Sequence, residues 1–149
     1  MIYWFTGQPG SGKTSLALEL KKVMEKDRLF TYHVHHLDGD NVRELFQNKD
    51  YSEKGRRYNV DTVQKIAHYL HLNDYDVIVS LVSPYRDQRE NFKEIMGEEL
   101  VEIYTYATEK RPRAEFKVEN YEPPQNNYIS LDTTGRTAEK NMKLLAQNL

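Results

Sequence analysis

The chain has 149 residues, with 21 Lys and Arg against 23 Asp and Glu, so its formal charge is −2. The absence of Cys excludes disulfides, thiolate metal sites and a cysteine nucleophile. No run approaches about 18 apolar residues and no basic segment precedes the first apolar run, so we expect a cytoplasmic protein without a membrane span or signal peptide. The charge near zero also argues against nucleic acid as a partner.

Strand and helix patterns alternate along the chain. In order, the N-terminal half predicts a strand at 2–5, a helix at 15–26, a strand at 30–37, a short helix at 40–47 and a long helix at 52–72. The C-terminal half predicts a strand at 76–82, a helix at 84–96, a strand at 100–104, mostly loop at 105–127, a strand at 128–131 and a helix at 136–149. This alternation predicts a three-layer α/β/α sandwich around a mostly parallel five-stranded sheet.

Several residues are predicted to mark the ends of these elements. Asp40 and Asn41 are predicted to cap the short helix, Ser52 the long one, and Pro84 to open the helix that ends at Gly97. Residues 76–82 form a continuous β-branched run, which is typical of a parallel strand that is buried on both faces. We therefore expect this strand at the centre of the sheet.

Residues 7–14 read Gly-Gln-Pro-Gly-Ser-Gly-Lys-Thr and fit the phosphate-loop pattern G-x-x-x-x-G-K-[ST] between a predicted strand and helix. Glycines let backbone N–H groups turn toward an anion. Lys13 is predicted to reach the β- and γ-phosphates and Thr14 to ligate Mg²⁺, so the expected cofactors are ATP and Mg²⁺. We expect residues 1–149 to form a single P-loop kinase domain of the nucleoside-triphosphate-hydrolase type. The predicted nucleotide-binding residues here are Gly7, Gln8, Pro9, Gly10, Ser11, Gly12, Lys13, Thr14 and Ser15.

A second group of polar residues follows the predicted strands, at the edge where parallel sheets bind ligands. The second strand ends in Asp-Gly-Asp-Asn-Val-Arg at 38–43. Because Asp40 and Asn41 serve as helix caps in this prediction, Asp38 is left to face Mg²⁺ or an acceptor hydroxyl.

Arginines form the other part of this polar edge. Arg43, Arg56 and Arg86 are predicted to converge there, Arg86 within the run Ser-Pro-Tyr-Arg at 83–86. A planar guanidinium suits phosphate or sulfate, so the sequence predicts a second anion site.

Taken together, these motifs resemble the adenylylsulfate kinase (APS kinase) family over most of the chain. The phosphate loop is generic, whereas the runs at 38–43 and 83–86 are more specific. The resemblance implies transfer of the γ-phosphoryl group of Mg·ATP to the 3′-hydroxyl of adenylyl sulfate, which gives 3′-phosphoadenylyl sulfate and ADP in sulfate assimilation. Family members are commonly homodimers, so the implied partners are this small-molecule substrate, ATP and a second copy.

The resemblance also implies residue roles. It makes Lys13, Asp38 and Ser83 catalytic and gives Thr14 and Asp38 to the metal. In part of the family the residue matching Ser83 is a phosphoserine intermediate. Direct in-line transfer needs no such step, and a serine before proline favours a backbone-capping hydroxyl. The implied sulfonucleotide contacts are Asp38, Asp40, Arg43, Arg56, Asn59, Ser83, Pro84 and Phe116.

The chain departs from the family pattern at two places. The family run Asp-Arg-x-x-Asn-x-Arg-Arg is replaced at 55–62 by Gly-Arg-Arg-Tyr-Asn-Val-Asp-Thr, without the later arginines. The family lid after Tyr104 is longer, and here Lys110, Arg111, Arg113 and residues 116–117 stand in for it. Arg111 is predicted to approach ATP, and Phe116 to replace the aromatic that stacks on the acceptor adenine.

Several alternatives stay open from the sequence. A shorter lid suits a kinase for another hydroxyl, in a nucleotide or at a nucleic-acid end, or a nucleotide-binding module without catalysis. Residues 105–120 can also be a plain linker. His33 and His35 would share one face of a strand while His36 points away, so no histidine metal site is predicted.

Overall fold

The computed structural model describes residues 1–26 and 34–149. Within these residues five strands form one sheet in the order β2-β3-β1-β4-β5, and every pairing is parallel. This confirms the predicted parallel sheet. The strands are β1 (Ile2–Thr6), β2 (Val34–Asp38), β3 (Asp76–Ser80), β4 (Leu100–Tyr106) and β5 (Tyr128–Asp132).

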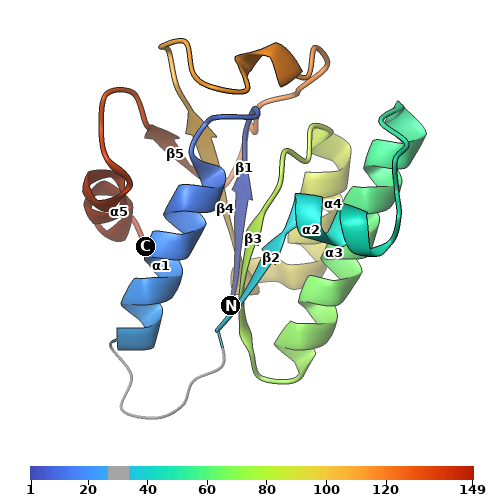
Figure 1. Ribbon diagram of the computed structural model, residues 1–149. Helices are drawn as coiled ribbons and strands as arrows, with labels where there is room; N and C mark the ends of the chain where they lie inside the picture. The colour runs from blue at the N-terminus through green and yellow to red at the C-terminus, as the bar shows by residue number, and fades with distance from the viewer. Residues whose placement is uncertain (27–33) are drawn as a thin grey trace.

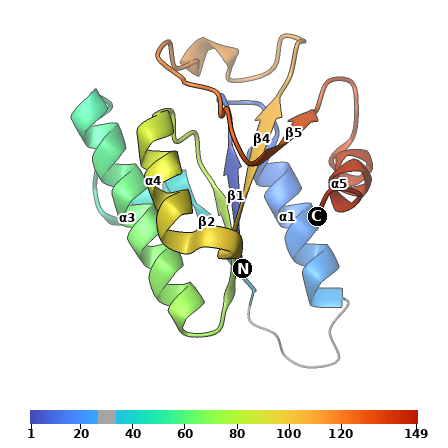
Figure 2. The same ribbon diagram turned by 180° about the vertical axis from the view of Figure 1, so that it is seen from behind.

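Helices cover both faces of the sheet. Helices α1 (Lys13–Lys26) and α5 (Ala138–Ala146) lie on one face, and α3 (Glu53–Leu72) and α4 (Arg86–Met96) lie on the other (Figures 1 and 2). The short α2 (Gly39–Leu45) joins β2 to α3, and the 3-10 turns η1 (Gly97–Glu99) and η2 (Ala114–Phe116) lie before and after β4. The three predicted layers are confirmed. Among the described helices, none has the length and apolar character of a membrane span.

The core has two halves, one on each side of the sheet. In β1, Trp4 packs in the half that contains α3 and α4, and Phe5 in the half that contains α1 and α5. In β3, Val77 and Val79 belong to the first half and Ile78 to the second, and all three are 0% exposed. A strand buried on both faces in this way lies inside the sheet and not at its edge, although the middle strand is β1 and not, as expected, β3.

Two predicted helix starts are wrong. Asp38, not Asp40, caps α2, because its Oδ1 accepts the Asp40 N–H at 2.9 Å. Helix α4 begins at Arg86 with Tyr85 as its cap, not at Pro84. The carbonyl of Pro84 instead accepts the Glu122 N–H at 2.8 Å, which holds this residue in a loop.

Other boundaries agree with the prediction or shift by a few residues. Ser52 caps α3 as predicted, by accepting the Gly55 N–H at 3.3 Å. Strand β4 continues to Tyr106, and α5 begins only after Thr137, whose hydroxyl accepts the Lys140 N–H. The predicted second strand starts at residue 30, but residues 30–33, including His33, lie outside the described residues.

Candidate active site

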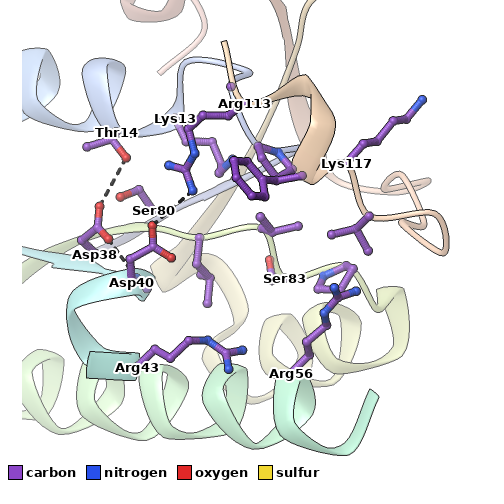
Figure 3. A pocket seen from close by; sticks show the side chains of 18 of the residues that line it. Lys13, Thr14, Asp38, Asp40, Arg43, Arg56, Ser80, Ser83, Arg113 and Lys117 are labelled. Atoms are coloured by element: carbon purple, nitrogen blue, oxygen red, sulfur yellow. Dashed lines mark hydrogen bonds and ion pairs between the residues drawn. The ribbon is translucent and has the colours of Figure 1, made fainter. Parts of the chain in front are cut away.

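A cavity of about 970 Å³ opens at the carboxyl ends of the strands. Figure 3 shows Lys13 and Thr14 on one side of it and Arg43 and Arg56 on the other. Most residues singled out in the sequence line this cavity. They are Pro9, Gly10, Gly12, Lys13, Thr14, Ser15, Asp38, Asp40, Arg43, Arg56, Asn59, Ser83, Pro84, Arg111, Arg113, Phe116 and Lys117.

Three phosphate-loop residues do not line the cavity. Gly7 packs against β4, where an added Cβ would lie 2.2 Å from the Thr105 carbonyl oxygen. The Ser11 hydroxyl lies 2.8 Å from the Thr105 hydroxyl, and the Gln8 carboxamide binds the backbone of Val118. The side chains of Gln8 and Ser11 therefore fix the loop from outside.

The phosphate loop holds Lys13 in a folded-back position. Lys13 begins α1, and its Nζ donates to the carbonyl oxygens of Gly7 at 2.9 Å and Gln8 at 2.8 Å. Burial of the ammonium group, with the Arg113 charge second, lowers the pKa of Lys13 to about 8, although Asp40 and Asp38 oppose the shift. A buried cation without a full counter-charge favours an incoming anion.

We expect binding of a non-hydrolysable ATP analogue to weaken above about pH 8. Below that pH, Lys13 is charged in the free protein and ready to meet phosphate. Above it, the free protein must take up a proton to restore the ammonium, so the affinity falls by up to about tenfold per pH unit. Calorimetry between about pH 6.5 and 9.5 measures this. A wild-type profile that matches that of Lys13→Ala would contradict the assignment.

Thr14 and Asp38 place two oxygen ligands side by side. The Thr14 hydroxyl donates to Asp38 Oδ2 at 3.3 Å, while Asp38 Oδ1 caps α2 (Figure 3). The Asp38 carboxylate is therefore held by two elements at once. A hydroxyl and a carboxylate form the hard oxygen set that Mg²⁺ accepts. The described residues contain no group of three or more His, Asp or Glu for a metal, so a cation here would depend on these two residues, phosphate and water.

The wall opposite the phosphate loop carries two arginines. Arg43 is 9% exposed, donates from Nη1 to the Asp50 carbonyl oxygen at 2.8 Å and lies over the Tyr51 ring at 4.3 Å. Arg56 lines the cavity, and its guanidinium has no hydrogen bond or ion pair with another described residue, while its backbone N–H donates to the Ser52 carbonyl oxygen at the start of α3. Arg43 is thus held in place by neighbouring protein groups, and the Arg56 guanidinium is available to bind an anion.

Arg86 does not join this wall. Its Nε donates to the Pro123 carbonyl oxygen at 2.9 Å, and it is absent from the cavity lining. The predicted convergence of three arginines is therefore wrong for Arg86, because this residue starts α4 and turns toward the loop before β5. Asn59, also predicted at the site, lines the cavity and donates from Nδ2 to the Gly39 carbonyl oxygen at 3.3 Å.

Ser83 lies in a strained loop at the floor of the cavity. Its φ is +37° and it is 2% exposed. The hydroxyl accepts from Trp4 Nε1 at 3.0 Å and donates to the Thr6 hydroxyl at 3.1 Å. These partners are side chains of β1, rather than the backbone groups that the sequence favoured. Both hydrogen bonds restrain the hydroxyl.

Residues 107–127 cross the open end of the strands and supply the remaining wall (Figure 1). Arg111 donates to the Thr133 carbonyl oxygen at 2.7 Å and pairs with Glu109. Arg113, with φ +71°, lies 3.6 Å from Asp40 across the cavity mouth (Figure 3). Lys110 does not line the cavity, whereas Lys117 does.

Loss of the Arg113 side chain is expected to lower turnover without lowering the melting temperature. The Arg113–Asp40 pair is 58% and 75% exposed, so it adds little to stability. A mobile cation at the mouth acts chiefly in the closed, reacting state. We expect Arg113→Ala to reduce kcat by about tenfold, and Arg111→Ala also to destabilise the fold because it loses the Thr133 contact. Unchanged kinetics for the double variant would make residues 105–120 a plain linker.

Some residues of the cavity were not singled out by the sequence analysis. Ser80 ends β3, and its hydroxyl lies 2.7 Å from His36 Nε2. The rule that ligands bind beyond strand ends was the signal that could have found it. Glu115 comes from a polar stretch with no periodic pattern, so nothing in the sequence distinguished it, whereas Lys117 was already expected to stand in for part of the family lid.

Comparison with known proteins agrees with the motifs. The family model described as adenylylsulphate kinase matches residues 1–132. A probable adenylyl-sulfate kinase of Aeropyrum pernix is 33% identical, with 97% of this chain and 90% of the relative covered. An adenylyl-sulfate kinase of Staphylococcus carnosus is 29% identical, with 100% and 83% covered.

The folds also agree. The structure of a Mycobacterium tuberculosis APS kinase, solved with AMPPNP and APS, matches with a TM-score of 0.79 at 22% identity, over 98% of this chain and 95% of that one. The alignment with the Staphylococcus carnosus relative spans 169 positions, so that relative has segments without a counterpart among the 149 residues here. The chain belongs to the adenylylsulphate kinase family.

Proposed function

We propose that this chain transfers the γ-phosphoryl group of ATP to the 3′-hydroxyl of adenylyl sulfate. The observation that carries the proposal is one cavity between a phosphate loop and an arginine wall, with the Asp38 carboxylate beside Thr14. The phosphate loop supplies a site for the triphosphate, and the wall with Arg43 and Arg56 supplies one for a second anion.

Lys13 is proposed to release the Gly7 and Gln8 carbonyl groups and donate to the β- and γ-phosphates. In phosphoryl transfer the protein contributes mainly position and charge, since the reaction needs no covalent step on the enzyme. Because the acceptor hydroxyl then attacks the γ-phosphoryl group directly, a nearby carboxylate is needed to orient that hydroxyl and take its proton, and Asp38 is proposed for this role. Ser83, restrained by Trp4 and Thr6, is proposed to shape the floor beside Pro84.

Thr14 and Asp38 are the residues proposed to hold Mg²⁺. Bound there, the cation would neutralise developing charge on the phosphates. The chemistry of the two oxygen ligands supports Mg²⁺ over a softer metal.

The predicted homodimer also stays a proposal, which light scattering coupled to size-exclusion chromatography tests.

Coupled ADP release tests the proposed reaction directly. Adding adenylyl sulfate to the protein with Mg·ATP is expected to start ADP release and to yield 3′-phosphoadenylyl sulfate, which mass spectrometry detects.

Asp38→Asn should lower kcat by at least about a hundredfold. Asparagine is an equally good N-cap, so this change removes the charge and keeps α2 capped. Asp61→Asn, at an exposed pair on α3, serves as the matched control.

A kinase for another hydroxyl is the second candidate, because relatives contain segments missing here and the Phe116 side chain is 62% exposed at the cavity. A panel of adenylyl sulfate, nucleosides and a 5′-hydroxyl oligonucleotide separates the two. A preference for adenylyl sulfate of less than about tenfold, or about 1.4 kcal/mol, would overturn the proposed acceptor. ATP binding without turnover on any acceptor would favour a binding module instead.

A further inference from the structure

Gln8 links the phosphate loop to a segment far along the chain. Its Nε2 donates to the Val118 carbonyl oxygen at 2.7 Å, and its Oε1 accepts the Val118 N–H at 2.8 Å. A carboxamide is the side-chain group that can satisfy the donor and the acceptor of one residue together. The side chain of this phosphate-loop residue therefore binds the segment that forms the wall of the cavity.

This pair is the main attachment of that part of the wall. Between 107 and 120, all of which the structure describes, Val118 alone has a buried side chain. Among the described residues, the other hydrogen bonds from 114–120 to residues outside this range stay within the same loop, from Ala114 N–H to Arg111 and from Phe116 N–H to Arg113. Glu115, Phe116 and Lys117 line the cavity directly before Val118, so the Gln8 contact determines where they lie.

The backbone of Gln8 has a second task. Its carbonyl oxygen accepts from Lys13 Nζ at 2.8 Å, and Lys13 must leave this position to reach phosphate. A neighbouring contact joins the same two segments, because an added Cβ on Gly10 would lie 2.5 Å from the Pro112 carbonyl oxygen. Any rearrangement of the phosphate loop on nucleotide binding should therefore also move the part of the cavity wall formed by residues 112–118.

We propose that Gln8 is a positioning residue that couples occupancy of the phosphate loop to the acceptor wall at 115–118. The inference rests on the proposed function, since it assigns this wall to the acceptor. With nucleotide bound, the rigid loop holds Gln8, and Gln8 holds Val118. Phe116 and Lys117 are then presented to the acceptor only after ATP is in place.

Hydrogen exchange and kinetics on three variants test the coupling. In Gln8→Leu we expect exchange protection of residues 115–118 to fall by about tenfold and the acceptor KM to rise by about tenfold, with the ATP Kd within about twofold. A non-hydrolysable ATP analogue should increase protection of 115–118 in the wild type and not in Gln8→Leu. Gln147→Leu, at the exposed end of α5, is the matched control and should behave like the wild type.

Gln8→Glu adds a readout that a merely structural role would not move. At about pH 7.5 the carboxylate keeps the Val118 N–H but repels the Val118 carbonyl oxygen, so protection should fall as in Gln8→Leu. At about pH 3.3, one unit below the ordinary Glu pKa, the carboxyl is mostly protonated and donates again, and protection relative to the wild type at the same pH should recover. Failure of this recovery would overturn the proposal.

The kinetic outcomes also separate this inference from the proposed function. Equal loss of acceptor and ATP affinity in Gln8→Leu, or no change in either, would overturn the coupling. A wild-type protein that ignores adenylyl sulfate would overturn the proposed acceptor, while the exchange response to the ATP analogue would still decide the coupling.

Discussion

Replacing Lys13 with Ala is expected to lower kcat by about a thousandfold while the protein stays folded. Removal of one group that stabilises transition-state charge costs about a hundred- to a thousandfold in comparable sites. Lys13 is 8% exposed and its only hydrogen bonds within the described chain go to the Gly7 and Gln8 carbonyl oxygens. Single-turnover kinetics with saturating ATP and acceptor measure the chemical step without the binding steps.

The control for this variant is Lys26→Ala, an exposed lysine at the far end of the same helix. Burial lowers the pKa of Lys13, so the charged ammonium group destabilises the fold when no nucleotide is bound. Removal of the Lys13 side chain should therefore not lower the melting temperature. A kcat for Lys13→Ala within about tenfold of the wild type would remove Lys13 from the catalytic set.

The fold could be predicted from the sequence because local patterns and the sheet agree. The β-branched run of Val77, Ile78 and Val79 is buried on both faces, which only an interior parallel strand allows. The glycine loop between a strand and a helix then sets the position of the phosphate site at the strand ends. Both signals come from neighbouring residues, so a single sequence contains them.

Helix starts were harder to predict because several residues competed for each cap. Asp38 and Asp40 both suit an N-cap, and only the geometry of the turn made Asp38 the acceptor of the Asp40 N–H. Pro84 suits the first turn of a helix, yet its carbonyl group is bound to Glu122 from a distant loop. Tertiary contacts of this kind override local preference.

Long-range side-chain contacts could not be predicted at all. The Gln8–Val118 pair joins residues with no shared pattern. The same is true of Arg86, which resembles a ligand-binding arginine in the sequence but donates to Pro123 in the structure. Which charged residue faces the cavity depends on where the loops before α4 and β5 meet, and periodicity contains no information about that.

A buried ion network holds these loops together. Arg89 on α4 and Glu102 on β4 are each 1% exposed, with Arg89 Nε and Glu102 Oε1 at 2.7 Å. Arg89 also donates to the carbonyl oxygens of Ser83, at 2.6 Å, and Glu122. Lys93 Nζ lies 2.6 Å from the other oxygen of Glu102. Lys93 also pairs with Glu90 at 2.7 Å, so two carboxylates and two cations form the network beside the floor of the cavity.

Glu102→Gln is therefore expected to destabilise the protein by about 3–5 kcal/mol, since it leaves the buried Arg89 charge without its partner. For a domain of this size the melting temperature should fall by about 10 °C, and urea unfolding should give the matching loss. Glu98→Gln, an exposed change in η1, is the control. A loss below about 1 kcal/mol would mean that water and the Ser83 and Glu122 carbonyl oxygens already compensate for the Arg89 charge. Because Arg89 binds the Ser83 carbonyl group, the residual folded protein should also turn over more slowly.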